Sequence, residues 1–206
     1  MDATLSQASK ILSLFEDAPR EQIQDLLESG LLADLRDGNI AGVNRDDFRH
    51  LVGLKPRIRS TIVATFTITC EGRKTSELVR LGKYDWTKDW IVDERFPIEP
   101  HEPVTRTIEF IECDYDPSSK EVLEELERHG LKGPTYEDAL EFGVEHPEQQ
   151  RKRPHVFLHE AVLGPSGYRF VLALGGDAGY RRLDLPWFGR RWHRAGVFAG
   201  VREETL

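Results

Sequence analysis

Hydrophobic residues change their spacing at residue 59, and this change separates a helical segment from a β-rich body. In the stretch RSTIVATFTITC, residues 59–70, apolar side chains alternate with threonines. One face carries Ile62, Ala64, Phe66, Ile68 and Cys70, and the other carries Thr61, Thr65, Thr67 and Thr69. A two-residue alternation rich in β-branched side chains is typical of a strand with one buried face. The stretch therefore predicts a strand at the start of the β-rich body.

Residues 1–56 have the apolar spacing of helices. We expect one helix before Pro19, a second that Pro19 opens, a third after Gly30, and a fourth that Asn44 caps and Gly53 ends. A helix that reads DNA is usually basic, whereas this segment has a net charge of −4. It is interpreted as a small helical cap or a protein-docking module.

Residues 57–103 are predicted to hold a β hairpin and an ordered loop. A turn at Gly72 leads from the first strand to a second stretch, ELVRLGKY, residues 77–84. The long segment that follows contains three prolines and two tryptophans, and its indole side chains favour an ordered loop.

Residues 104–206 are predicted to form a C-terminal α+β module. A strand in VTRTIEFIEC is followed by two helices, whose starts have the capping-box residues Ser118 with Glu121 and Thr135 with Asp138. Four short strands are then expected, at 155–163, 168–174, 180–185 and 196–202. The whole chain is thus predicted to be α+β, with an N-terminal helical segment and a mixed, mainly antiparallel β body that includes two helices.

Composition indicates an ordinary globular protein, with 39% hydrophobic and 31% charged residues. No apolar run approaches the roughly 20 residues that cross a bilayer, and the first ten residues lack the features of a signal peptide. We expect a cytoplasmic protein with no membrane partner. In that compartment Cys70 and Cys113 are expected to be buried free thiols rather than a disulfide.

The charges are segregated along the chain. The net charge is −8, but residues 151–202 carry +7. One interpretation is that this basic segment docks against acidic residues of the same chain. The other is that it binds an anionic partner, including nucleic acid. The acidic surface considered for the first interpretation consists of Glu109, Glu112, Asp114 and Asp116.

The stretch LPWFGRRWHR, residues 185–194, concentrates aromatic and arginine side chains, which are enriched at interface hot spots. It predicts a non-enzymatic binding module that recognises a protein or an anionic ligand, with no catalytic residue, metal or cofactor. The ligand-binding residues proposed from the sequence are Trp187, Phe188, Arg190, Arg191, Trp192, His193 and Arg194.

Two alternative functions remain open at this point. The first is nucleic-acid binding through residues 151–202, in which aromatic side chains stack on bases and guanidinium groups hold phosphates. The second is a metal-dependent enzyme that uses the carboxylates of Glu112, Asp114 and Asp116. The pair His155 and His159 is not expected to share a metal ion, because four residues of strand separate the two side chains by about 13 Å. The sequence does not predict an oligomeric state.

Three stretches, TIEFIECD, TYEDALEFGVEHPEQQRKRPHVFLHE and LDLPWFGRRWHRAGVFAGVRE, resemble a recurrent C-terminal module of uncharacterised bacterial proteins. That resemblance implies a recurring architecture and no particular activity. The order of elements is also similar to C-type-lectin-like folds, which implies a ligand surface just before the last strand, at residues 187–194. This sequence lacks the calcium-binding set and the cysteine framework of the lectins, so the resemblance implies no calcium-dependent sugar site.

Overall fold

The chain divides into two units, residues 1–57 and 58–206. The computed structural model describes residues 5–39, 42–43, 48–49, 51–52, 58–164 and 166–203. The first unit contains helices α1 (Leu5–Ser13), α2 (Arg20–Glu28) and α3 (Leu31–Asp37), where helical spacing predicted them. The predicted cap of a fourth helix, Asn44, lies outside the described residues.

The helices of the first unit expose most of their apolar side chains. Neither α2 nor α3 has a buried residue. Leu12 on α1 is 72% exposed and Leu27 on α2 is 62% exposed. These helices therefore do not enclose an apolar core within the described part of this unit.

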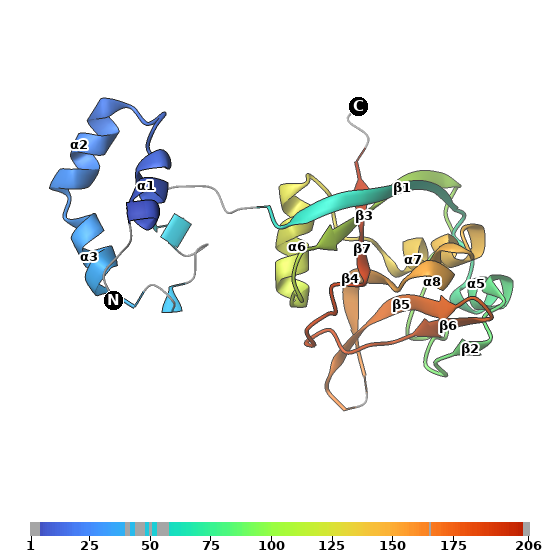
Figure 1. The fold of residues 1–206 in the computed structure, drawn as a ribbon. Helices are drawn as coiled ribbons and strands as arrows, with labels where there is room; N and C mark the ends of the chain where they lie inside the picture. The colour runs from blue at the N-terminus through green and yellow to red at the C-terminus, as the bar shows by residue number, and fades with distance from the viewer. Residues whose placement is uncertain are drawn as a thin grey trace. The chain divides into compact units, whose positions relative to one another are not determined.

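The second unit is built on one seven-stranded sheet with the order β1-β3-β7-β4-β5-β6-β2 (Figure 1). Neighbouring strands are antiparallel except for the pairs β4–β7 and β2–β6, which are parallel. The predicted α+β class with a mixed, mainly antiparallel body is confirmed. The strands are β1 (Ser60–Cys70), β2 (Trp86–Thr87), β3 (Val104–Cys113), β4 (His155–Leu163), β5 (Arg169–Asp177), β6 (Tyr180–Asp184) and β7 (Val197–Arg202).

Strand β1 confirms the strand predicted at residues 59–70, although a register shift between Ile62 and Ala64 leaves Ile62 37% exposed. Its partner is not the one that a hairpin would give. It pairs with β3 along its length, from Ser60 opposite Cys113 to Cys70 opposite Val104. Residues 58–103 and 104–203 therefore share one sheet.

The predicted second strand of the hairpin is wrong, because residues 75–82 form helix α5 (Thr75–Gly82). The Leu78 side chain of this helix is completely buried, and the Thr75 hydroxyl donates a hydrogen bond to the Phe96 carbonyl at 2.5 Å. Leucine, glutamate and arginine are strong helix formers, and the helix places Thr75 and Leu78 on its buried side. The segment buries its apolar side as a helix packed on the sheet, and one edge of β1 is left without a pairing strand among the described residues.

Three more helices follow: α6 (Ser119–Arg128), α7 (Tyr136–Glu145) and α8 (Gln149–Lys152). Both predicted capping boxes are confirmed, with the side chains of Ser118 and Thr135 accepting the backbone N–H groups of Glu121 and Asp138. Because each cap satisfies a backbone donor that the helix leaves free, it fixes where the helix begins.

The sheet is covered on both faces, with α6 on one face and α5 and α7 on the other (Figure 1). The core on the α7 side includes Leu78, Phe110, Leu140, Phe142, Phe157 and Leu174. The core on the α6 side, called the α6-side core below, includes Ile111, Val122, Leu126, Val156, Val171, Trp192 and Phe198. In the described segments no helix is long and apolar enough to cross a membrane.

The cysteines and the strand histidines have the environments that the sequence predicts. Cys70 and Cys113 are buried free thiols. His155 and His159 are both buried on β4. The ring of His159 accepts the backbone N–H of Leu172 at Nε2, at 2.9 Å. These histidines therefore serve the core as neutral, hydrogen-bonded side chains.

Candidate ligand-binding pocket

The β6–β7 loop, residues 185–196, is anchored to the module by Trp192. This side chain is 5% exposed and belongs to the α6-side core, where its ring meets Phe198 edge-on at 6.2 Å. The indole Nε1–H donates to the Ser119 hydroxyl at 2.9 Å, and that hydroxyl donates in turn to the Phe188 carbonyl. The loop is therefore fixed to the first residue of α6.

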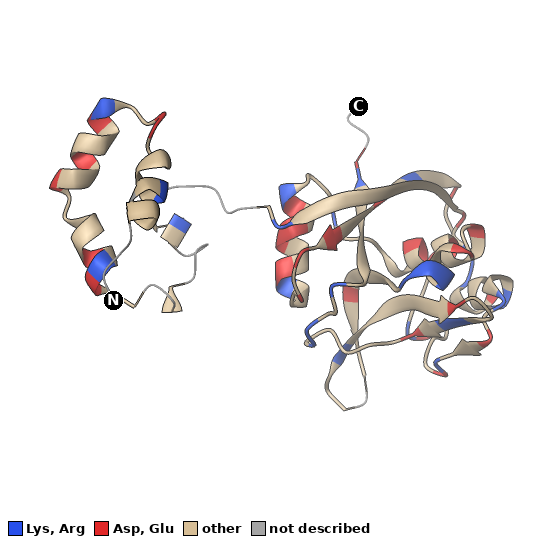
Figure 2. Ribbon diagram, in the orientation of Figure 1, with Lys and Arg blue, Asp and Glu red and all other residues tan. Residues whose placement is uncertain are grey.

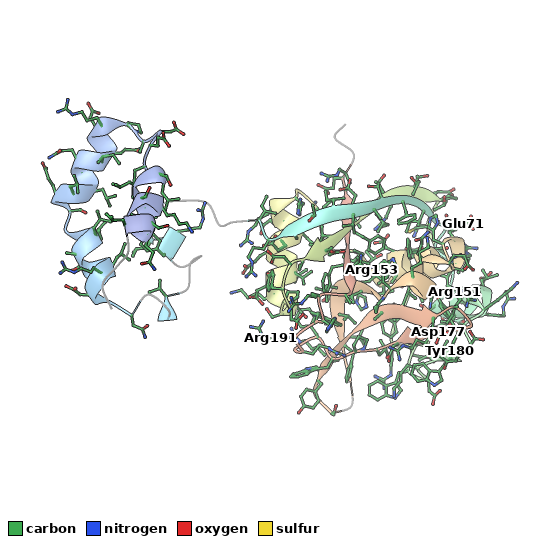
Figure 3. The ribbon with its side chains drawn as sticks, in the orientation of Figure 1. Glu71, Arg151, Arg153, Asp177, Tyr180 and Arg191 are labelled. Atoms are coloured by element: carbon green, nitrogen blue, oxygen red, sulfur yellow. The ribbon has the colours of Figure 1, made fainter. Side chains whose placement is uncertain are left out.

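A second set of hydrogen bonds joins the loop to the turn before α6. The backbone N–H of Trp192 donates to the Pro117 carbonyl at 2.8 Å. Asp116 accepts the backbone N–H of Arg194 at 2.9 Å and its guanidinium at 3.2 Å, and these bonds lower the pKa of the Asp116 carboxyl. Arg191 donates to the Asp116 carbonyl at 2.8 Å and lies beside α6 (Figure 3).

Half of the basic side chains in residues 151–202 form ion pairs with carboxylates of the same chain. Blue segments of the loop lie near red residues of α6 in Figure 2. This is the first of the two interpretations drawn from the charge asymmetry. The pairs are Arg151 with Glu148, Arg153 with Glu112, Arg191 with Glu121, Arg194 with Asp116 and Arg202 with Glu109.

The carboxylates considered for a metal-dependent enzyme are each engaged by an arginine. Glu112 pairs with Arg153 at 2.6 Å, and Asp114 pairs with Arg59 at 3.0 Å. Asp116 holds the loop as described above. Among the residues that the structure describes, no three His, Cys, Asp or Glu side chains are grouped so that they could hold a metal ion.

Two arginines near the loop are not paired in this way. Within the described ranges, the guanidinium groups of Arg182 on β6 and Arg190 on the loop have no carboxylate in ion-pair distance, and both side chains are exposed. Arg190 lies over the Trp192 ring, 5.3 Å from its centre, and donates weakly to the Arg191 carbonyl at 3.4 Å.

Arg182 and Arg190 line the same cavity, which has a volume of about 280 Å³. It lies on the α6 side of the sheet, over β4, β5 and β6, where Val156 and Ala173 also belong to the packing of the α6-side core. The loop forms its wall. The lining consists of Pro154, Val156, Ala173, Leu174, Gly175, Arg182, Asp184, Pro186, Arg190, Trp192, His193, Ala195 and Gly196.

The cavity exists because α6 covers only the other part of this face. A Cβ atom on Gly200 of β7 would lie 2.8 Å from side-chain atoms of Leu126 and Leu131, so the helix packs directly on that strand. On the uncovered part of this face, the side chains of Arg182 and Asp184 project to the α6 side. Arg181 and Leu183, which alternate with them along β6, are buried on the opposite side of the sheet.

The polar groups on the rim of the cavity are mainly donors. His193 accepts the backbone N–H of Ala195 at Nδ1, at 3.1 Å, so the neutral ring carries its proton on Nε2 and can donate it. Asp184 is the acidic side chain of the lining. Its Oδ1 accepts the backbone N–H of Leu185 at 2.8 Å. The cavity thus combines an apolar floor with two guanidinium groups, an imidazole and one carboxylate.

The structure separates the ligand-binding residues that the sequence suggested. Arg190, Trp192 and His193 line the cavity, whereas Trp187, Phe188, Arg191 and Arg194 do not. Trp187 is 46% exposed and meets Tyr168 edge-on at 5.5 Å, and Phe188 packs against the α6-side core. Arg191 and Arg194 face Glu121 and Asp116 instead.

Sequence reasoning missed Arg182 and Asp184. The signal was present in YRRLD, residues 180–184, because a strand with Arg181 and Leu183 on one face must place Arg182 and Asp184 together on the other. What could not be found in this way was the loop that closes a cavity over that face.

Fold and site together define an α+β module with a small pocket whose floor is apolar and whose rim is mainly basic. No family model, no curated protein and no solved structure matches the chain. The resemblances to a bacterial C-terminal module and to C-type-lectin-like folds therefore stay predictions.

Proposed function

We propose that residues 58–206 form a non-enzymatic binding module that captures an anionic ligand, free or carried by a protein, in the pocket beside the β6–β7 loop. The observation that carries this proposal is that some arginines of this region form ion pairs with carboxylates of the described residues, whereas two at the pocket do not. Arg191 and Arg194 are paired with Glu121 and Asp116, whereas Arg182 and Arg190 border a cavity without a carboxylate partner in the described ranges.

The chemistry of the rim suits a carboxylate, sulfonate or phosphate group. A guanidinium group presents several N–H donors in a plane and binds such anions through two parallel hydrogen bonds. The apolar floor, including Val156 and Ala173, then takes an uncharged body attached to the anion.

The size of the pocket favours a small ligand or a single side chain over a polymer. Its volume of about 280 Å³ is just below the roughly 300–1,000 Å³ that is typical of small-molecule sites. Nucleic-acid binding needs a broad basic surface, and the ion pairs described above neutralise half of the basic side chains that would form it. We therefore favour the pocket over a nucleic-acid interface.

The test uses anilinonaphthalene sulfonate, an apolar anion whose fluorescence rises when it binds in an apolar site. The full chain should bind this dye, and the double variant Arg182→Gln with Arg190→Gln should bind it at least about tenfold more weakly, since each charge-assisted hydrogen bond contributes about 1.5–3 kcal/mol. Arg169→Gln is the matched control, because it removes an exposed guanidinium that lies outside the pocket lining. It should change the dissociation constant less than about twofold.

Equal losses per removed charge in the double variant and the control would show that only net charge matters, and would refute the proposed pocket. Failure of the unmodified chain to bind the dye would refute it as well. An electrophoretic shift of RNA that survives the double variant and weakens steeply with salt would support the nucleic-acid interpretation instead.

A further inference from the structure

Asp184 is the unexpected member of the pocket. A carboxylate beside a bound anion repels it, so an anion site is better without one unless that carboxylate binds a donor of the ligand. Asp184 is half-buried and uses Oδ1 for the backbone N–H of Leu185, while Oδ2 has no hydrogen bond to the described residues. One acceptor oxygen thus remains for the ligand.

Asp184 and Arg182 do not neutralise each other. They occupy alternate positions on β6, about 6.6 Å apart along the strand, and they form no ion pair in the described structure. An acceptor and a donor at this spacing match a ligand whose anionic group and N–H group are attached to the same carbon atom, because both side chains can reach such a group together.

The rest of the pocket decides what else the ligand carries. Arg190 stands on the loop side, over Trp192, and gives the anion a second guanidinium. The floor below includes Val156 and Ala173, which carry no charge and favour an apolar group, and Pro186 of the loop adds a further apolar side chain to the lining.

We infer that the ligand is an α-amino or α-acylamino carboxylate with an apolar side chain. The inference rests on the proposed function of the pocket. Arg182 and Arg190 hold the carboxylate, Asp184 accepts the N–H of the neighbouring nitrogen, and the apolar side chain lies on the floor. This chemical group occurs in two sources, a free amino acid and the C-terminus of a protein.

The test compares phenylalanine with 3-phenylpropionate, which has the same ring and carboxylate but no nitrogen. Displacement of the dye from the full chain should show phenylalanine binding at least about tenfold more tightly, the ratio expected for one hydrogen bond to a charged group. In Asp184→Asn this ratio should fall to about one, with 3-phenylpropionate binding at least as tightly as before. Asp177→Asn is the matched control, because Asp177 also accepts a backbone N–H, that of Gly179, but lies outside the lining.

Two further compounds distinguish the sources. A short peptide that ends in phenylalanine should displace the dye more tightly than free phenylalanine if the ligand is a protein C-terminus, and the same peptide with an amidated C-terminus should not displace it. Weaker binding of the peptide than of phenylalanine identifies the free amino acid as the ligand.

Equal binding of phenylalanine and 3-phenylpropionate would overturn the inference, as would failure of the whole panel to displace the dye. Neither result affects the proposed function, which depends on dye binding by Arg182 and Arg190. If dye binding does not depend on Arg182 and Arg190, both the proposed function and this inference are refuted.

Discussion

Replacement of Trp192 tests whether the β6–β7 loop is held mainly by the side chain that it buries in the α6-side core or by the side chains that it exposes at the surface. Trp192 is 5% exposed, meets Phe198 edge-on and donates its indole N–H to Ser119. Trp187, five residues earlier in the same loop, is 46% exposed and is the natural comparison.

The magnitude follows from these contacts. Trp192→Phe keeps most of the buried ring but removes one hydrogen bond, which lowers the free energy of unfolding by about 1–1.5 kcal/mol. Trp192→Ala also leaves a large cavity in the α6-side core and lowers it by about 3–5 kcal/mol. Trp187→Ala removes a half-exposed ring and is expected to cost less than about 1 kcal/mol.

Thermal unfolding of the full chain, followed by far-ultraviolet circular dichroism, measures these differences. For chains of this size 1 kcal/mol corresponds to about 2–4 °C in Tm, so Trp192→Phe should lower Tm by about 2–6 °C and Trp192→Ala by about 6–20 °C. Equal effects of the alanine variants at 187 and 192 would refute the reasoning, because they would mean that both tryptophans lie at the surface or both in the core.

Three further predictions concern the core and the helix starts. Burial raises the pKa of Cys113 to about 12 and also raises that of Cys70, so neither thiol should react with a disulfide reagent near pH 8 until denaturant is added; rapid labelling of the folded chain would contradict their placement. Thr135→Ala should lower the free energy of unfolding by about 1 kcal/mol in urea titrations, whereas Thr135→Ser should be nearly neutral because it keeps the cap. Burial lowers the pKa of His155 and His159 to about 4. Unfolded imidazoles titrate near 6.5, so the stability that the neutral rings contribute is complete above that pH and is lost as the pH falls toward 4; a flat Tm between about pH 6.5 and 4.5 would argue against it.

Local patterns of the sequence predicted much of the fold. The alternation at residues 59–70 became β1, and the boxes at Ser118 and Thr135 became the starts of α6 and α7. These features depend on residues within one turn or one strand, and the chain can satisfy them before distant segments meet. The four C-terminal strands were found for the same reason.

The failure at residues 75–82 has a tertiary cause. The apolar spacing there suits either a strand or a helix, and the choice depends on what its apolar side can be buried against. As α5 the segment buries Leu78 in the core on the α7 side, which residues from distant segments such as Phe110 and Leu140 complete.

The sequence by itself determined that an acidic chain ends in a basic, aromatic segment, because charge and composition need no structure. Only the tertiary structure decided which arginines are available for a ligand. The partners of Arg153, Arg194 and Arg202 lie 41, 78 and 93 residues away in the chain, and they meet because β3, β4, β7 and the turn before α6 share one sheet and its cover. Arg182 and Arg190 stay available for a ligand in the pocket, because this packing places no carboxylate of the described ranges within ion-pair distance of either guanidinium group.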